Sequence, residues 1–167
     1  MIHDDTERFP NRKNPRMKHY DYSTPNYYFI TICTHNKICI FGEPGKLNGF
    51  AEYVVQCLQE LPLHFPNTVV DKYVIMPNHI HMILILQDGS CNLSTVIGQL
   101  KSYVTRQIHR TLPNQAVWQP SFHDHVIRNQ KSYEAIWQYI ENNPLKWEDD
   151  CFYSDREPLY QNSKYDT

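Results

Sequence analysis

Two histidines alternate on one predicted strand and form the sharpest chemical signal in the chain. His79 and His81 flank Ile80, and residues i and i+2 of a strand point to the same side of a sheet. Their backbones would lie about 6–7 Å apart. Neutral imidazole is a common metal ligand, and two on one strand can hold one ion. The spacing indicates a metal site, and two partly buried histidines satisfied by backbone partners are the plain alternative.

A tyrosine and an asparagine on the last predicted helix can face the same site. Tyr139 and Asn143 lie one helical turn apart, to one side of the apolar stripe of that helix. A tyrosine just off the core face, with a carboxamide one turn on, can point into a crevice at the sheet edge. The alternative is a boundary aromatic residue followed by a C-terminal cap.

A second alternating pair, His123 and His125, lies on an extended segment. It could supply metal ligands, contact the residues that supply them, or be the end of a structural strand. The sequence does not assign it a role. The chain has no Gly-rich phosphate loop and no G-x-S-x-G elbow, so P-loop and serine-hydrolase interpretations have no support.

The elements that must position these residues indicate an α+β fold. Runs rich in aromatic and β-branched residues predict strands over 27–34, 68–76 and 79–86, with an extended segment over 117–128. Helical spacing predicts helices over 51–61, 93–112 and 131–142. The turn residues Pro77 and Asn78 predict a hairpin. This order is typical of a ferredoxin-like antiparallel sheet with helices on one face, followed here by a C-terminal helix carrying Tyr139.

The net charge of −2 is an average over unlike segments. Residues 147–167 carry −4, whereas residues 1–20 carry +2 and residues 92–146 carry +3. We therefore expect a basic arm over 1–20, one domain over 21–146 and an acidic tail over 147–167, to which we assign no function. The average charge does not exclude nucleic acid as a partner.

Membrane insertion and secretion are not expected. The most apolar run, over 73–86, contains a proline and two histidines and falls short of the ~20 apolar residues that a spanning helix needs. The N-terminus lacks the apolar core of a signal peptide. The five cysteines include no C-x-x-C pair, which favours reduced thiols in the cytoplasm.

Several ordered motifs resemble a known family. The run from Tyr73 to His81 resembles the HUH motif of single-tyrosine transposases, in particular the REP-associated tyrosine transposase-like branch. The segments 118–129 and 139–147 resemble two further signatures of that branch. Tyr20-Asp21-Tyr22 and the runs over 28–31 and 41–42 also fit, so the resemblance spans roughly residues 12–152.

The resemblance implies roles for the residues singled out above. His79 and His81 match the metal-binding histidines, Tyr139 matches the nucleophile, and Asn143 occupies the position that completes the metal site. The implied reaction is attack by Tyr139 on single-stranded DNA, which leaves a 5′-phosphotyrosine and a free 3′-OH that later rejoins DNA. The phosphodiester energy is retained in the covalent intermediate, so no ATP is needed. Mg²⁺ or Mn²⁺ is the expected cofactor.

The implied partner is hairpin-forming DNA with a flanking single strand, for a cytoplasmic, nucleoid-associated enzyme. A homodimer with active sites completed in trans fits the family, and the sequence does not decide it. Two alternatives stay open: a domesticated hairpin-binding protein without strand transfer, and a metal-dependent phosphodiesterase that uses water. Basic side chains that could contact phosphates are Arg12, Lys13, Arg16, Lys18, Lys101, Arg106, Arg110 and Arg128.

Overall fold

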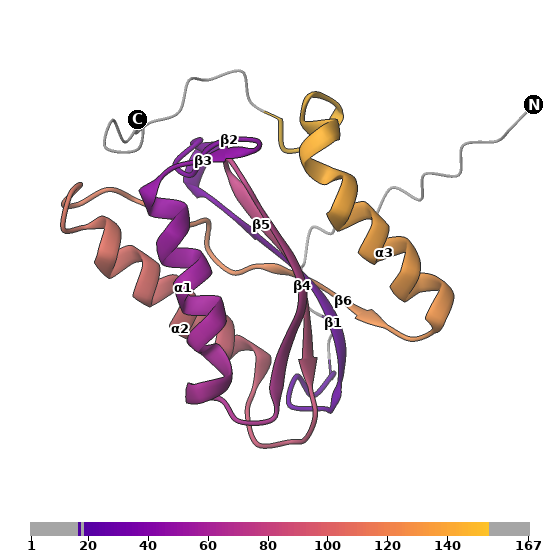
Figure 1. Cartoon of the computed structure of the whole chain (residues 1–167). Coiled ribbons are helices and arrows are strands. Elements are labelled where there is room, and N and C mark those ends of the chain that lie inside the picture. The colour runs from indigo at the N-terminus through magenta and orange to yellow at the C-terminus, as the bar shows by residue number, and fades with distance from the viewer. Residues whose placement is uncertain (1–16, 18, 154–167) are drawn as a thin grey trace, which may run out of the picture.

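The core of the protein is a four-stranded antiparallel sheet (Figure 1). The computed structural model describes residue 17 and residues 19–153. The strand order is β4-β5-β1-β6. The four strands are β1 (Asn26–Cys33), β4 (Thr68–Met76), β5 (His79–Leu86) and β6 (His123–Ile127). The histidine pair thus lies on β5, one of the two central strands.

The remaining elements complete the predicted topology. The main strands and helices follow the order β1-α1-β4-β5-α2-β6-α3, which confirms the ferredoxin-like fold with an added C-terminal helix. A small ribbon, β2 (Gly42–Glu43) with β3 (Lys46–Leu47), precedes α1. The helices are α1 (Gly49–His64), α2 (Leu93–Ile108) and α3 (Gln130–Asn142), with short 3-10 helices over His35–Lys37 and Asn143–Asp149.

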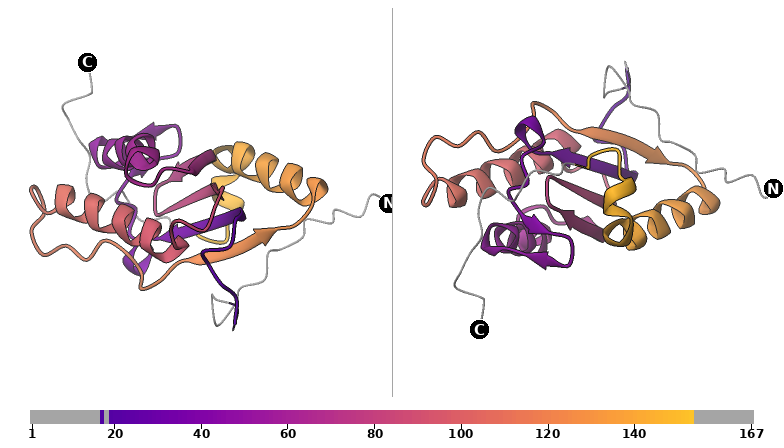
Figure 2. Two further views of the ribbon diagram at one scale, coloured as in Figure 1. Left: turned by 90° about the horizontal axis from the view of Figure 1, so that it is seen from below. Right: turned by 90° about the horizontal axis from the view of Figure 1, so that it is seen from above.

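The two faces of the sheet carry different layers. Helices α1 and α2 lie side by side on one face, and α3 lies on the other (Figure 2). On β5, Ile80, Met82 and Leu84 belong to the large core beneath α1 and α2. Ile83, one residue away, belongs to a smaller cluster beneath α3. Strand alternation therefore places His79 and His81 on the face that α3 covers.

An asparagine is the N-cap residue of each of the three α-helices in the described part of the chain. Asn48 accepts hydrogen bonds from the backbone N–H groups of Phe50 and Ala51 at the start of α1. Asn92 and Asn129 accept one each at the starts of α2 and α3. Each cap satisfies donors that the first helical turn leaves without an intrahelical partner. The caps fix where each helix begins, including the helix that carries Tyr139.

The predicted hairpin is confirmed, because Met76 pairs with His79 across the turn at Pro77 and Asn78. Three predicted elements differ from the structure by more than one residue at an end. The first helix is longer than predicted, α2 ends at Ile108 rather than at residue 112, and only 123–127 of the extended segment 117–128 pairs as a strand. Pro120 has no N–H to donate and Ser121 adopts a positive φ of 66°, so the chain bends before β6.

Within the described residues, no helix is both long enough and apolar enough to cross a membrane.

Candidate active site

The two histidines lie at the beginning of β5, directly after the Pro77–Asn78 turn. On the neighbouring strand β1, Cys33 pairs with His79 and Thr31 pairs with His81. The exposed fractions of His79 and His81 are 0% and 1%. Their ring centroids are 4.5 Å apart, so the two imidazoles lie side by side as their alternation predicts.

Each histidine is held through its Nδ1 atom. His79 Nδ1 donates to Oδ1 of Asn78 at 2.8 Å, and His81 Nδ1 is hydrogen-bonded to the Thr31 hydroxyl at 2.8 Å. The Asn78 amide is itself oriented, because its Nδ2 donates to the carbonyl of Phe152 at 2.7 Å. These partners are side chains and leave both Nε2 atoms directed into the site. Metal-binding histidines are commonly fixed in this way.

Helix α3 brings Tyr139 to the histidines of the same chain. Its hydroxyl lies 3.4 Å from Nε2 of His81. Phe29 on β1 packs against both groups, with ring centroids 5.4 Å from His81 and 6.1 Å from Tyr139. Asn143 is both the C-cap residue of α3 and a buried residue, with an exposed fraction of 3%. The cap and the site interpretations of Asn143 are therefore compatible.

Asp150 joins the site, although the sequence analysis gave it no role. The chain turns back after α3 through the 3-10 helix Asn143–Asp149 and places Asp150 Oδ2 3.6 Å from His79 Nε2. One ligand atom from each of His79, His81 and Asp150 lies within 4.8 Å of the others. Asp150 falls in a run of three acidic residues that resembles an ordinary solvated tail, so no local signal distinguishes it. Its side chain is nevertheless only 1% exposed.

Three buried polar atoms converge here without hydrogen-bond partners among the described residues. They are Nε2 of His79, Oδ1 of Asn143 and Oδ2 of Asp150. Leaving such atoms unpaired in the interior is costly, and buried polar groups normally find partners. A nitrogen, a carboxamide oxygen and a carboxylate oxygen are all ligands for a divalent cation. The residues present therefore fit a metal ion.

The site is covered by the segment that follows α3. The Phe152 ring lies 4.6 Å from the His79 ring and 5.9 Å from the His81 ring, and the Trp147 ring stacks on His79 at 6.1 Å. Both aromatic residues belong to the stretch expected as part of an acidic tail. This segment therefore shields both imidazoles, which are 0% and 1% exposed.

Burial sets the protonation states in the site. It lowers the pKa of His81 to about 3, and burial together with the neighbouring His81 lowers the pKa of His79 well below 6.5. Both rings are therefore neutral at physiological pH, as metal ligation requires. Burial and the nearby Asp150 raise the pKa of Tyr139 above its ordinary value. A cation in the site would oppose the rise in the pKa of Tyr139, because positive charge favours the phenolate, and would keep both imidazoles neutral.

The second histidine pair lies beside the site rather than in it. On β6, His123 pairs with Thr31 and His125 pairs with Phe29 across β1. The one cluster of metal-ligating side chains among the described residues is His79, His81 and Asp150, so it does not include this pair. Thr31 lies between His123 and His81 across the sheet, so His123 is one strand further from the site.

Of the basic residues expected to contact DNA, the four that the structure describes do not gather at the histidines. Arg12, Lys13, Arg16 and Lys18 lie outside the described residues. Arg128 is exposed just before α3, at the end of the helix far from Tyr139.

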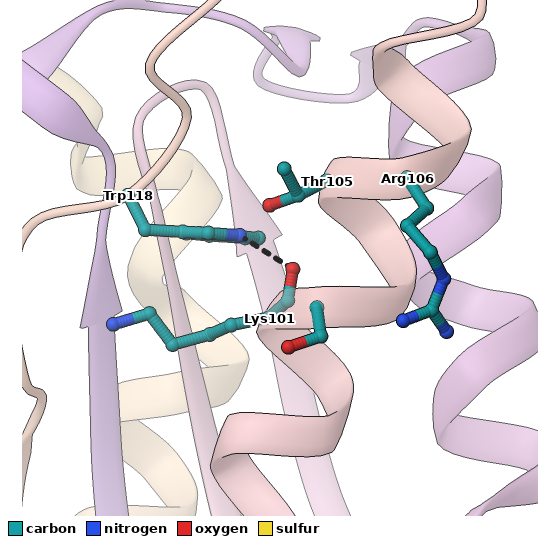
Figure 3. Close-up of a pocket in the computed structure, with 5 residues that line it drawn as sticks. Lys101, Thr105, Arg106 and Trp118 are labelled. Atoms are coloured by element: carbon teal, nitrogen blue, oxygen red, sulfur yellow. Dashed lines mark hydrogen bonds between the residues drawn. The ribbon is translucent and has the colours of Figure 1, made fainter.

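Three of these residues belong to α2 and its end, on the other face of the sheet from the site. Arg110 is exposed just after α2. Lys101 and Arg106 line an open pocket of about 470 Å³ with Thr105 and Trp118 (Figure 3). Lys101 donates from Nζ to the carbonyls of Gln119 and Ser121 at 2.8 and 2.7 Å, so its ammonium holds a loop in place.

Comparisons with known proteins show the family of this chain. A family model described as "Transposase IS200 like" matches residues 24–143, which include the histidine pair, Tyr139 and Asn143. A Haemophilus influenzae protein described as "Uncharacterized protein" is 37% identical over 169 residues, covering 86% of this chain and 94% of its own length.

Two further similarities concern REP-associated tyrosine transposases. The enzyme of Escherichia coli strain K12 is 32% identical over 77 residues, which are 46% of this chain and 44% of that protein. The solved structure of a REP-associated tyrosine transposase bound to a REP hairpin has a TM-score of 0.63 at 23% identity, covering 81% of this chain and 74% of that chain. The structural similarity supports the fold.

Proposed function

Because the chain belongs to the IS200-like transposase family, we propose that it cleaves and rejoins single-stranded DNA through a covalent bond to Tyr139. One observation carries the proposal. The Tyr139 hydroxyl lies 3.4 Å from Nε2 of His81, beside a buried cluster in which one polar atom each of His79, Asn143 and Asp150 lacks a hydrogen-bond partner among the described residues. A nucleophile beside ligands for a cation is the arrangement that phosphodiester transfer needs.

The reaction has two balanced transfers. The Tyr139 oxygen attacks the phosphorus, a new P–O bond forms, and the bond to the 3′ oxygen breaks. The products are a 5′-phosphotyrosyl enzyme and a DNA strand with a free 3′-OH, while the phenolic proton leaves Tyr139. A 3′-OH then attacks the phosphotyrosine, which restores the phosphodiester and the tyrosine. Helix α3 supplies the orientation of the attacking oxygen, and such positioning is itself a large part of catalysis.

His79, His81 and Asn143 would hold a divalent cation, as the sequence predicts, with Asp150 as a further oxygen ligand. Asn78 and Thr31 orient the two imidazoles for this purpose. When bound, Mg²⁺ or Mn²⁺ supplies positive charge that polarises the scissile phosphate. Two imidazoles favour Mn²⁺ over Mg²⁺, whereas the oxygens of Asn143 and Asp150 suit both ions.

The proposed substrate is DNA with a hairpin end and a flanking single strand. A REP-associated tyrosine transposase has been solved with a REP hairpin, and its fold is similar to this one. We propose that Lys101, Arg106, Arg110 and Arg128, with Arg12, Lys13, Arg16 and Lys18 of the arm, contact phosphates away from the cleaved bond. A DNA substrate would associate the protein with the nucleoid.

In the structure Tyr139 approaches His81 of its own chain, and a homodimer that exchanges α3 stays a prediction.

A labelled hairpin oligonucleotide with a single-stranded flank tests the proposal. We expect Mn²⁺ to produce a protein–DNA adduct that survives denaturation, and we expect Tyr139→Phe to abolish it. Tyr103→Phe, on α2 and remote from the site, is the matched control and should retain the adduct. Hairpin binding without any adduct would indicate the domesticated binding protein. Cleavage that survives Tyr139→Phe would indicate the phosphodiesterase.

A further inference from the structure

Strand β4 carries an irregularity opposite α3. Val70 pairs with Leu84 and Lys72 pairs with Ile83, so Asp71 is an extra residue that forms a β-bulge. A bulge disrupts strict alternation and redirects side chains at that point. Here it lets two consecutive residues, Asp71 and Lys72, present their side chains to the same helix.

Both bulge residues contact α3. Tyr133 donates from its hydroxyl to Oδ2 of Asp71 at 2.6 Å. Lys72 forms an ion pair with Glu141, and its Nζ lies 4.0 Å from the centroid of the Trp137 ring. Without the bulge, one of the two side chains would point toward the α1 and α2 face.

The three partners on α3 form one stripe. Tyr133, Trp137 and Glu141 are spaced four residues apart, and residues i and i+4 are neighbours on a helix surface. The stripe spans about two helical turns. In the sequence, Tyr139 lies between its last two residues, Trp137 and Glu141. The stripe runs beside a separate apolar stripe, Ile136 and Ile140, which packs on the sheet. Helix α3 is therefore attached along its core face and along the edge of β4.

The apolar face of α3 alone makes few buried contacts with the sheet. Of the five buried residues in the cluster beneath α3, the helix contributes Ile136 and Ile140, and its Tyr133 and Tyr139 are partly buried against the cluster. An apolar face this small restrains rotation about the helix axis less well than it does together with polar contacts along β4. A displacement of about 1 Å at a reacting group can lower a rate by about 100-fold. The placement of Tyr139 is therefore sensitive to the contacts with β4.

We propose that the β4 bulge attaches α3 to the edge of the sheet, and that Asp71 and Lys72 are positioning residues that hold Tyr139 against the histidines of its own chain. The inference rests on the proposed role of Tyr139 as nucleophile. The side-chain contacts of both bulge residues described above are made with α3. Their effect is expected on the rate of strand cleavage and not on hairpin affinity.

Charge exchange across the ion pair tests the proposal. We expect Lys72→Glu and Glu141→Lys each to lower the single-turnover rate of adduct formation by about tenfold, while the hairpin Kd changes less than twofold. The double variant restores the ion pair in reverse and should recover part of the rate. Recovery stays partial because the cation over Trp137 is lost. Lys131→Glu makes the same charge change at an exposed position of α3 and should retain the full rate.

A second readout follows the helix itself. Hydrogen exchange of the α3 amides should quicken in Lys72→Glu and in Tyr133→Phe, while exchange in α1 and α2 stays unchanged. Single variants with full rates and unchanged exchange would overturn the positioning role and leave the proposed function intact, provided that Tyr139→Phe still abolishes the adduct. Absence of the adduct in the unmodified protein would overturn both.

Discussion

The two faces of the sheet are built for different tasks. Beneath α1 and α2, 25 of the described residues form one buried apolar cluster. Beneath α3 the corresponding cluster has five residues, and the space beside it is filled by His79, His81 and Asn143, all buried. The large apolar core and the buried polar site therefore lie on opposite faces of the sheet. The apolar burial on the α1/α2 face stabilises the fold. The core on the α3 face is smaller, which leaves room for buried polar groups.

Adjacent residues of β5 give the sharpest test of this division. Leu84 and Ile83 are both fully buried, on the α1/α2 face and the α3 face respectively. We expect Leu84→Ala to lower the free energy of unfolding by about 3–5 kcal/mol. Ile83→Ala should cost about 2 kcal/mol, because α3 can settle toward the cavity. Urea unfolding measures both, and an equal or larger loss for Ile83→Ala would contradict the division.

Metal binding should stabilise the α3 face. A ligand that binds only the folded protein stabilises it by about 2.7 kcal/mol at 100 times its Kd. We therefore expect Mn²⁺ to raise the thermal midpoint and EDTA to reverse the rise. His81→Asn and Asp150→Asn should each reduce the shift, whereas His123→Asn, on β6 and separated from His81 by Thr31, should retain it. A shift of equal size in all three variants would place the metal elsewhere.

The cover over the histidines should control their reactivity. Phe152 packs on both rings, so Phe152→Ala should speed modification of His79 and His81 by diethyl pyrocarbonate several-fold. Tyr153→Ala, in the same segment but packed on Trp147, is the matched control. Mass spectrometry of the peptide that contains both histidines measures the rate. Equal rates in the unmodified protein and Phe152→Ala would show that the cover does not limit access.

The smallest effect is expected on the α1/α2 face. Arg106→Ala should lower the salt dependence of hairpin binding by about one unit of slope, because one phosphate contact is lost. The cleavage rate at saturating DNA should not change, since α2 and Tyr139 lie on opposite faces of the sheet. Gln99→Ala, exposed on the same helix, is the control. An unchanged slope in Arg106→Ala would remove this residue from the DNA contacts.

Local periodicity explains what could be predicted from the sequence. Alternation on β5 places His79 and His81 on one side, and the helical period places Tyr139 one turn from Asn143. The order of strands and helices was sufficient for the fold. None of these relations depends on distant parts of the chain.

The residues that were missed depend on tertiary placement. Asp150 reaches His79 only because the chain reverses after α3, and nothing in its acidic run signals that return. The bulge at Asp71 was missed because the run from Thr68 to Met76 also fits a regular strand. The end of α2 at Ile108 was missed because Leu112 continues the apolar spacing beyond the last helical turn.

Cleavage in ¹⁸O-labelled water, followed by mass spectrometry of the protein and the DNA, tests the central claim most directly. Attack by Tyr139 is expected to leave a nucleotide adduct on the peptide that contains Tyr139, with no ¹⁸O in the DNA strand that is first released. Incorporation of ¹⁸O into a 5′-phosphate without any adduct, or an adduct on another residue, would contradict the account.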